Sequence, residues 1–134
     1  MSPRFFTLVE ANTELPWLVE QISEIRKELA NIDRLKASAE SLTKKAGSNG
    51  HSATNHHDPT EMQNEADLAA RKIREMLRVV ADKGIILRNP STGLSDFPSK
   101  NAQGEEIYLC WKSGEERIAF WHTPESGFAG RQPL

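Results

Sequence analysis

The stretch that decides the fold is the last third of the chain, Gly93–Leu134, which reads GLSDFPSKNAQGEEIYLCWKSGEERIAFWHTPESGFAGRQPL. Its clearest strand patterns are residues 106–112 and 117–122, separated by a turn at Ser113-Gly114. Two shorter apolar runs come before them, at 85–87 and 94–97, and Pro98 is expected to end the second. We therefore expect a four-stranded antiparallel β-meander over residues 84–122, followed by a glycine-rich C-terminal tail over 123–134.

Helical patterns fill the chain before this stretch. The segment Thr7-Leu8-Val9-Glu10 has the form of a capping box, which predicts a helix that begins near Leu8. Apolar residues then recur in steps of three and four, as in the seam of a coiled coil: Leu15, Leu18, Ile22, Ile25, Leu29 and Ile32. Pro16 lacks a backbone donor, which predicts either a kink in this helix or, as we favour, a short first turn followed by a long helix from about Glu14. The first helical arm is therefore expected over residues 8–46.

A second helical arm is expected over residues 60–83, with Thr60 as its N-cap and Gly84 ending it. The segment between the arms, 47–59, reads GSNGHSATNHHDP and has no large apolar residue, so we expect a flexible connector. Two apolar stripes joined in this way predict a long antiparallel helical hairpin. The whole chain, 1–134, is expected to be one α+β domain.

Composition excludes several classes of protein. The net charge of -2 argues against a nucleic-acid-binding protein. Arg71, Arg74 and Arg78 do share a helix face, but Asp67 and Glu75 interleave with them, which is typical of a solvated surface. One cysteine cannot form an internal disulfide, and no apolar run reaches the ~18 residues of a membrane span. Because the first residues also lack the pattern of a signal peptide, we expect a cytoplasmic protein that does not bind membranes.

Several motifs of the chain are similar to those of a known bacterial family. They are FTLVEAN, Leu15-Pro16, GLSDFP, IYLCW, SGEE, FWH and GFAGRQPL. Together they resemble the family known as domain of unknown function 2203, over Phe6–Leu134 apart from the connector. The resemblance supports the element boundaries given above and assigns no activity, substrate or cofactor. It marks five motif positions: Asp96, Cys110, Glu115, His122 and Arg131.

A zinc site is one interpretation of Cys110 and His122, because zinc accepts both ligand types and the residues lie on adjacent predicted strands. A four-residue connection, Ser113–Glu116, predicts that Ile107 lies opposite His122. Since side chains alternate along a strand, Cys110 and His122 would then point to opposite faces of the sheet. This register argues against a shared metal site and predicts that Cys110 is a small apolar residue of the core.

His122 alone is a candidate acid, base or metal ligand at the end of its strand. Glu10, Asp96 and Glu115 are the carboxylates that folding could bring to it. The competing interpretation is structural, with His122 hydrogen-bonded so that it locks two parts of the fold together.

The tail offers a second candidate site, at Gly130 and Arg131. A glycine lets the backbone approach an anion, and a guanidinium binds carboxylate or phosphate through two donors. A structural ion pair between Arg131 and Asp96 or Glu10 explains the same pattern equally well. The connector histidines, His51, His56 and His57, could bind a divalent metal, but ordering a flexible segment costs conformational entropy. No cofactor is therefore evident, and a divalent metal stays an open alternative.

Two functions fit these patterns. The first is a non-catalytic interaction or assembly module, a homo-oligomer such as a dimer, joined through the helical hairpin or the sheet. The sequence predicts Trp111 and Trp121 on opposite faces of the sheet, so both faces need apolar packing partners. The narrow apolar seam of the long helix needs a partner as well. The alternative is a small enzyme or a protein that binds a small-molecule ligand or a metal. Its pocket would lie around His122, Arg131 and a carboxylate.

Overall fold

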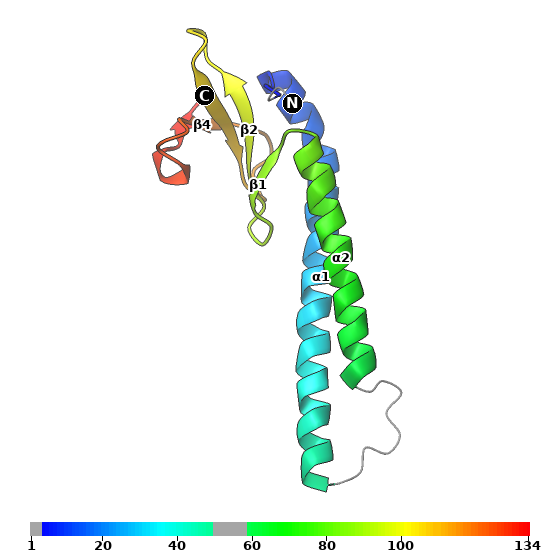
Figure 1. Ribbon diagram of the computed structural model, residues 1–134. Helices are drawn as coiled ribbons and strands as arrows, with labels where there is room; N and C mark the ends of the chain where they lie inside the picture. Colours follow the sequence, from blue (N-terminus) through cyan, green and yellow to red (C-terminus); the bar gives the residue numbers. More distant parts are fainter. Residues whose placement is uncertain (1–3, 50–58) are drawn as a thin grey trace. The chain divides into compact units, whose positions relative to one another are not determined.

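The computed structural model describes residues 4–49 and 59–134. Two helices, α1 (Leu8–Asn49) and α2 (Pro59–Asp82), precede a five-stranded antiparallel sheet, so the fold is α+β (Figure 1). The chain divides into two compact units, Met1–Glu24 with Met76–Leu134, and Ile25–Glu75. Most of the predicted connector, with its histidines, lies outside the described residues. Within the described ranges, neither helix has the apolar run that a membrane crossing requires.

The predicted capping box starts α1. The backbone N–H of Thr7 donates to Glu10 Oε1 at 2.9 Å, and the N–H of Glu10 donates to Thr7 Oγ1 at 3.1 Å. Pro16 lies inside α1, which is one helix from Leu8 and not a short turn followed by a second helix. Gly84 follows the end of α2 and has a φ of +92°, as its predicted role in ending that helix requires.

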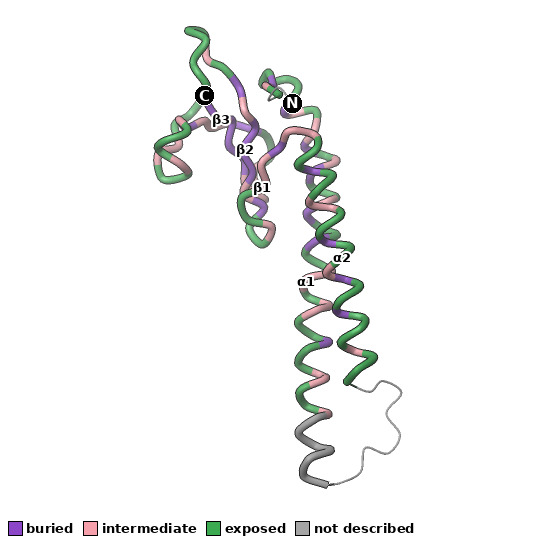
Figure 2. Tube along the Cα trace, viewed as in Figure 1, coloured by how far each residue is buried: buried purple, intermediate pink, exposed green. Residues whose placement is uncertain are grey.

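In the unit Ile25–Glu75, the two helical segments run antiparallel and bury one stripe each (Figures 1 and 2). The buried residues are Ile25, Leu35, Ala66, Ala69 and Ile73. Lys72 Nζ lies 3.7 Å from Glu28 Oε2 beside this seam. The helical apolar pattern is therefore used inside the chain, by one arm packing on the other.

The sheet follows chain order, β1-β2-β3-β4-β5, with five strands where the sequence predicted four. The strands are β1 (Ile86–Asn89), β2 (Leu94–Lys100), β3 (Glu106–Trp111), β4 (Phe120–His122) and β5 (Gln132–Pro133). The tail supplies the extra strand after a 3-10 turn, η1 (Phe128–Gly130). The N–H of Leu134 donates to the Ala119 carbonyl at 2.9 Å, which fixes the end of the tail against β4.

Strand β2 continues through Pro98, where the sequence predicted that it would end. β1 pairs with β2 only from Leu94 to Asp96. A proline at position 98 therefore does not deprive β1 of a backbone hydrogen bond. The Pro98 carbonyl accepts a hydrogen bond of 2.7 Å from the N–H of Phe6. The segment before α1 therefore replaces β1 along this part of β2.

One face of the sheet forms the core of its unit. Its buried side chains are Phe97, Ile107, Leu109 and Trp111. They pack with residues from the segment before α1, from both helices and from two loops: Phe6, Ala11, Leu15, Leu18, Ile22, Val80, Ile85 and Ile118. The rings of Phe6 and Phe97 meet edge to face, with centroids 5.3 Å apart. Figure 2 shows this burial concentrated along the central strands and the facing helix.

The register of β3 against β4 differs from the prediction by one residue. Tyr108, not Ile107, lies opposite His122, and Cys110 lies opposite Phe120. The prediction that Cys110 and His122 face opposite sides of the sheet was therefore wrong. The same shift turns Trp121 toward the core face, where it packs partly buried.

The cause of the shift is the connection between these strands, which is longer than a four-residue turn. Glu115 organises it: its carbonyl accepts from Trp111 Nε1 at 2.9 Å, and its carboxylate accepts from the N–H of Lys112 at 2.8 Å. The N–H of Ile118 donates to Asn12 Oδ1 of α1 at 2.9 Å, and the Ile118 side chain enters the core. Because of these contacts, β4 begins at Phe120 and not at the predicted residue 117.

Candidate functional site

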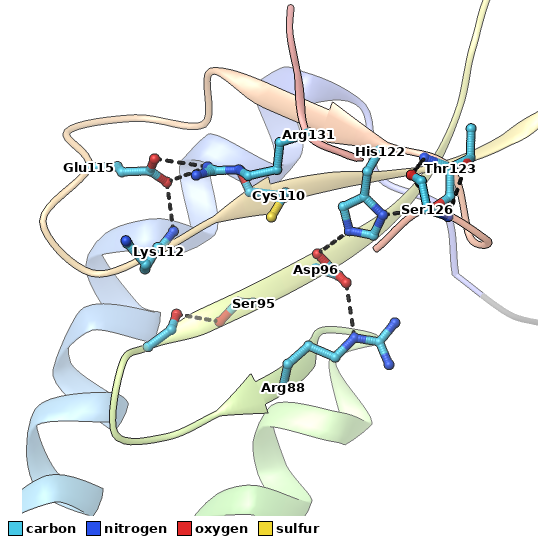
Figure 3. A network of polar contacts seen from close by, with 11 residues as sticks. Arg88, Ser95, Asp96, Cys110, Lys112, Glu115, His122, Thr123, Ser126 and Arg131 are labelled. Carbon is cyan, nitrogen blue, oxygen red and sulfur yellow. Dashed lines mark hydrogen bonds and ion pairs between the residues drawn. The ribbon is translucent and has the colours of Figure 1, made fainter. Parts of the chain in front are cut away.

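Three side chains of different chemistry meet on the sheet face opposite the core. Asp96 comes from β2, Cys110 from β3 and His122 from β4, and they are 3%, 0% and 2% exposed. Pairing across neighbouring strands puts them on one face. One ligand atom from each, a carboxylate oxygen, the thiol sulfur and a ring nitrogen, lies within 4.8 Å of the other two. Figure 3 shows His122 and Asp96 pointing at each other, with Cys110 beside them. We call these three residues the buried cluster.

Both ring nitrogens of His122 are hydrogen-bonded. Nδ1 lies 2.7 Å from the Thr123 carbonyl oxygen, and Nε2 lies 2.9 Å from Asp96 Oδ1. A carbonyl oxygen only accepts, so Nδ1 carries a hydrogen. The second contact requires one further proton between Nε2 and the carboxylate. The ring orientation and the atom that faces the cluster are therefore both fixed.

Arg88 completes the surroundings of Asp96. Its Nε donates to Asp96 Oδ2 at 2.9 Å, from a side chain that is 45% exposed. Sequence reasoning did not select Arg88. Arg88 follows the predicted first strand, 85–87, and lies where the pairing of β1 with β2 shifts between Leu87 and Asn89, so strand alternation does not place its side chain.

Cys110 is a protonated thiol in these surroundings. Burial raises its pKa to about 12, and the charge of the nearby Asp96 carboxylate acts in the same direction. A hydrogen bond to Asp96 further favours the neutral thiol, while Arg131 opposes the rise. The thiolate is the nucleophile in cysteine catalysis, and this raised pKa disfavours it.

Arg131 and Glu115 form the second polar group on this face. Arg131 Nη2 lies 2.7 Å and 2.8 Å from the two carboxylate oxygens of Glu115. The guanidinium also stacks over Phe120, 4.1 Å from the ring centroid, and over Phe128 at 4.8 Å. Arg131 Nη2 lies 3.4 Å from the Cys110 carbonyl oxygen, which connects this ion pair to the strand of the buried cluster.

The partner of Arg131 differs from the two predicted carboxylates. Asp96 pairs with His122 and Arg88, and Glu10 serves the capping box. Within 4–49 and 59–134, Arg131 Nε is a buried donor with no hydrogen-bond partner. Arg131 and Glu115 were both candidates, but the sequence did not predict their pairing.

Gly130 and Glu10 have structural contacts that account for them. The N–H of Gly130 donates to the Gly127 carbonyl at 3.0 Å, and a Cβ at position 130 would lie 2.4 Å from Ser126 Cβ. The close approach therefore requires glycine and uses the donor that an anion would need. Hydrogen bonds from Thr7 lower the pKa of Glu10, which is exposed at the start of α1.

An open groove lies on the core side of the sheet, away from the buried cluster. It has a volume of about 660 Å³ and is lined by residues that include Thr7, Leu8, Lys100, Trp121 and Leu134. Leu8 is 40% exposed and Leu134 is 56% exposed. The groove is therefore an apolar surface that the described chain leaves open.

The comparisons with known proteins give a family and no function. The family model that matches, over residues 4–134, is described as an uncharacterised conserved protein, domain of unknown function 2203. Neither a curated protein nor a solved structure matches the chain. The family match extends over both helices and all five strands, and it confirms the resemblance carried by the motifs. The chain therefore belongs to the domain of unknown function 2203 family.

Proposed function

We propose that the chain is a non-catalytic interaction module that pairs with a second copy of itself through the open groove beside its sheet. The observation that carries this proposal is the apolar groove, with Leu8 and Leu134 exposed along it. Apolar side chains gathered around a groove are typical of a contact surface. Helix–helix packing inside the chain already uses much of the long helical seam, which favours the sheet over the hairpin as the interface.

The candidate catalytic side chains support a structural role for the opposite face. His122 and Asp96 are buried and hydrogen-bonded to each other, and Arg131 is paired with Glu115. A substrate at either pair would have to replace contacts of 2.7 to 2.9 Å in a desolvated setting. The arrangement favours the interpretation in which these residues lock strands and tail together.

Self-complementarity of the groove favours a second copy as the occupant. One surface offers both an apolar hollow, with Trp121 in its lining, and exposed apolar side chains along it, Leu8 and Leu134. A two-fold axis through this surface would set the leucines of each copy into the groove of the other. The cytoplasmic location is part of the same proposal and rests on the single cysteine, which cannot form an internal disulfide.

Sedimentation velocity of the wild type, Leu134→Asp and Leu68→Asp tests this function. Leu68 is the matched control, since it is 63% exposed on α2 and lies in the other compact unit. Burying one leucine is worth about 1.5–3 kcal/mol, and a two-fold interface contains each substitution twice. We therefore expect Leu134→Asp to weaken a micromolar dimer by at least about 100-fold, with Leu68→Asp unchanged.

Two outcomes would contradict the proposal. A wild-type chain that sediments as a monomer well above micromolar concentration has no such assembly. Dissociation by Leu68→Asp with a stable Leu134→Asp dimer would move the interface to the helical hairpin.

The alternative function, a small-molecule or metal-binding protein, is favoured by a separate observation, the buried cluster of Asp96, Cys110 and His122.

A further inference from the structure

The buried cluster brings an oxygen, a sulfur and a nitrogen donor together from three neighbouring strands (Figure 3). We propose that Asp96, Cys110 and His122 bind one divalent transition-metal ion of the zinc class, through Oδ1, Sγ and Nε2. The ion would tie β2, β3 and β4 together on the face opposite the core. This site is independent of the proposed self-association.

The spacing of the three atoms suits such an ion. Zinc bonds of about 2.3 Å to sulfur and about 2.0–2.2 Å to nitrogen or oxygen place tetrahedral ligands roughly 3.3–3.7 Å apart. In the cluster, Nε2 and Oδ1 are 2.9 Å apart, and all three ligand atoms lie within 4.8 Å of one another. The required distances fall between these limits, so side-chain adjustments of about 1 Å would complete the geometry.

The outer contacts orient the ligands as they do in known metal sites. The Nδ1 hydrogen of His122 is held by the Thr123 carbonyl, which leaves Nε2 as the coordinating atom. Thr123 is itself held by reciprocal hydrogen bonds with Ser126, at 3.2 Å and 3.1 Å. Arg88 holds Asp96 Oδ2 and so presents Oδ1 to the cluster. Every ligand except the thiol therefore has a fixed orientation from outside the site.

The donor set matches the charge of a divalent ion. A thiolate and a carboxylate neutralise its +2 charge, and the imidazole binds as a neutral ligand. The Cys110 thiol must lose its proton to bind, and the bound ion then offsets the cost of burying a thiolate.

The mixture of donors selects the class of metal. A thiolate and an imidazole favour zinc, cobalt and related ions, whereas magnesium and calcium prefer an all-oxygen shell. Three protein ligands leave one tetrahedral position for a small fourth ligand such as water. Because all three ligands are almost completely buried, the role assigned to the ion is stabilisation of the sheet.

Cobalt titration of the full chain after removal of metals by a chelator tests the site. The sequence contains a single cysteine, so a thiolate-to-cobalt charge-transfer band can arise from Cys110 alone. We expect that band to saturate at one ion per chain and to disappear when zinc is added. Because the thiol must lose its proton to bind the ion, the apparent affinity for cobalt should rise with pH.

Variants separate this site from metal binding by the connector. Cys110→Ser should abolish the charge-transfer band, and His122→Gln should weaken cobalt binding by at least about 100-fold. The matched control replaces His51, His56 and His57 with glutamine and should keep the band. Far-ultraviolet circular dichroism checks that each variant is folded.

The wild type alone can overturn the proposal, even if a variant fails to fold. A folded wild-type chain without a thiolate band at saturating cobalt has no such site. Loss of binding in the connector variant alone would assign the metal to the histidines of the connector. Sedimentation of the same samples reports self-association separately, so failure of one proposal leaves the other intact.

Discussion

Alkaline pH should destabilise the metal-free protein through Cys110. Burial raises the thiol pKa from 9.0 to about 12, so the folded chain favours the protonated form more strongly than the unfolded chain does. The contribution of the neutral thiol to stability is fully present below pH 9. It is lost as the pH rises toward 12, at up to about 1.4 kcal/mol per pH unit. Between pH 9 and pH 10, the expected loss is about 1 kcal/mol.

The Cys110→Ser variant isolates this effect from other groups that titrate in alkali. A serine hydroxyl does not ionise in this range and can still donate to Asp96. Urea unfolding at pH 8, 9 and 10 should show the difference in unfolding free energy between wild type and variant shifting by about 1 kcal/mol over the last step. A difference that stays constant from pH 8 to pH 10 would refute the reasoning.

Thiol labelling gives a second measure of the same environment. At pH 8, a pKa near 12 leaves a thiolate fraction of about 10⁻⁴, against about 0.1 in the unfolded chain. A disulfide reagent should therefore modify Cys110 at least about a thousandfold more slowly in the folded protein than in urea. Native labelling within tenfold of the unfolded rate would show that the thiol is accessible and ionised.

Three further predictions concern the rest of the unit. In thermal unfolding, Glu10→Gln should lose less stability than the wild type as the pH is lowered. Hydrogen bonds from Thr7 lower the pKa of Glu10 in the folded chain. The contribution of Glu10 to stability is therefore present above its unfolded pKa and is lost as the pH falls through its folded pKa. Arg131→Ala should lower the free energy of unfolding in urea by roughly 2–3 kcal/mol because Glu115 loses its partner. A double-mutant cycle of Arg131 and Glu115 should give a coupling energy above about 1 kcal/mol. Additive effects of the two substitutions would contradict the pairing. Phe97→Ala should cost about 3–5 kcal/mol, and a loss below about 1 kcal/mol would contradict its place in the core.

The helices follow from the sequence because their signals are local. The capping box of Thr7 and Glu10 involves residues three apart, and both of its hydrogen bonds form. The apolar steps that begin at Leu15 identify the buried stripe correctly at Leu18 and Ile22. Such patterns can be read without knowing what the helix packs against.

The strand register could not be read in this way. Its determinant is a contact between Ile118 and Asn12, which are 106 residues apart, together with the contacts of Glu115 inside the connecting loop. A local turn rule counts only the residues of the connection, and an error of one reverses the face of every side chain. The argument against a zinc site rested on that register, and the one-residue error placed Cys110 and His122 on opposite faces of the sheet although they share one.

The candidate residues were better predicted than their partners. His122 and Asp96 were both selected and do pair, whereas Arg131 pairs with Glu115 and not with Asp96 or Glu10. Pairing depends on the path of the tail, which is fixed by β5 and has no local signal. Residue types that ionise can be found in a sequence, but their partners depend on the tertiary fold.

Strand β4 lies between the two proposed surfaces. Its consecutive residues Trp121 and His122 point to opposite faces, so Trp121 lines the groove and His122 completes the buried cluster. Leu134→Asp changes only the groove, and Cys110→Ser changes only the cluster. If Cys110→Ser also dissociates the dimer, the two faces of the sheet are coupled through its strands, since Leu109 of β3 lines the groove beside Cys110. A dimer that keeps its affinity while the metal is added or removed would show instead that the two surfaces act separately, which strand alternation alone predicts.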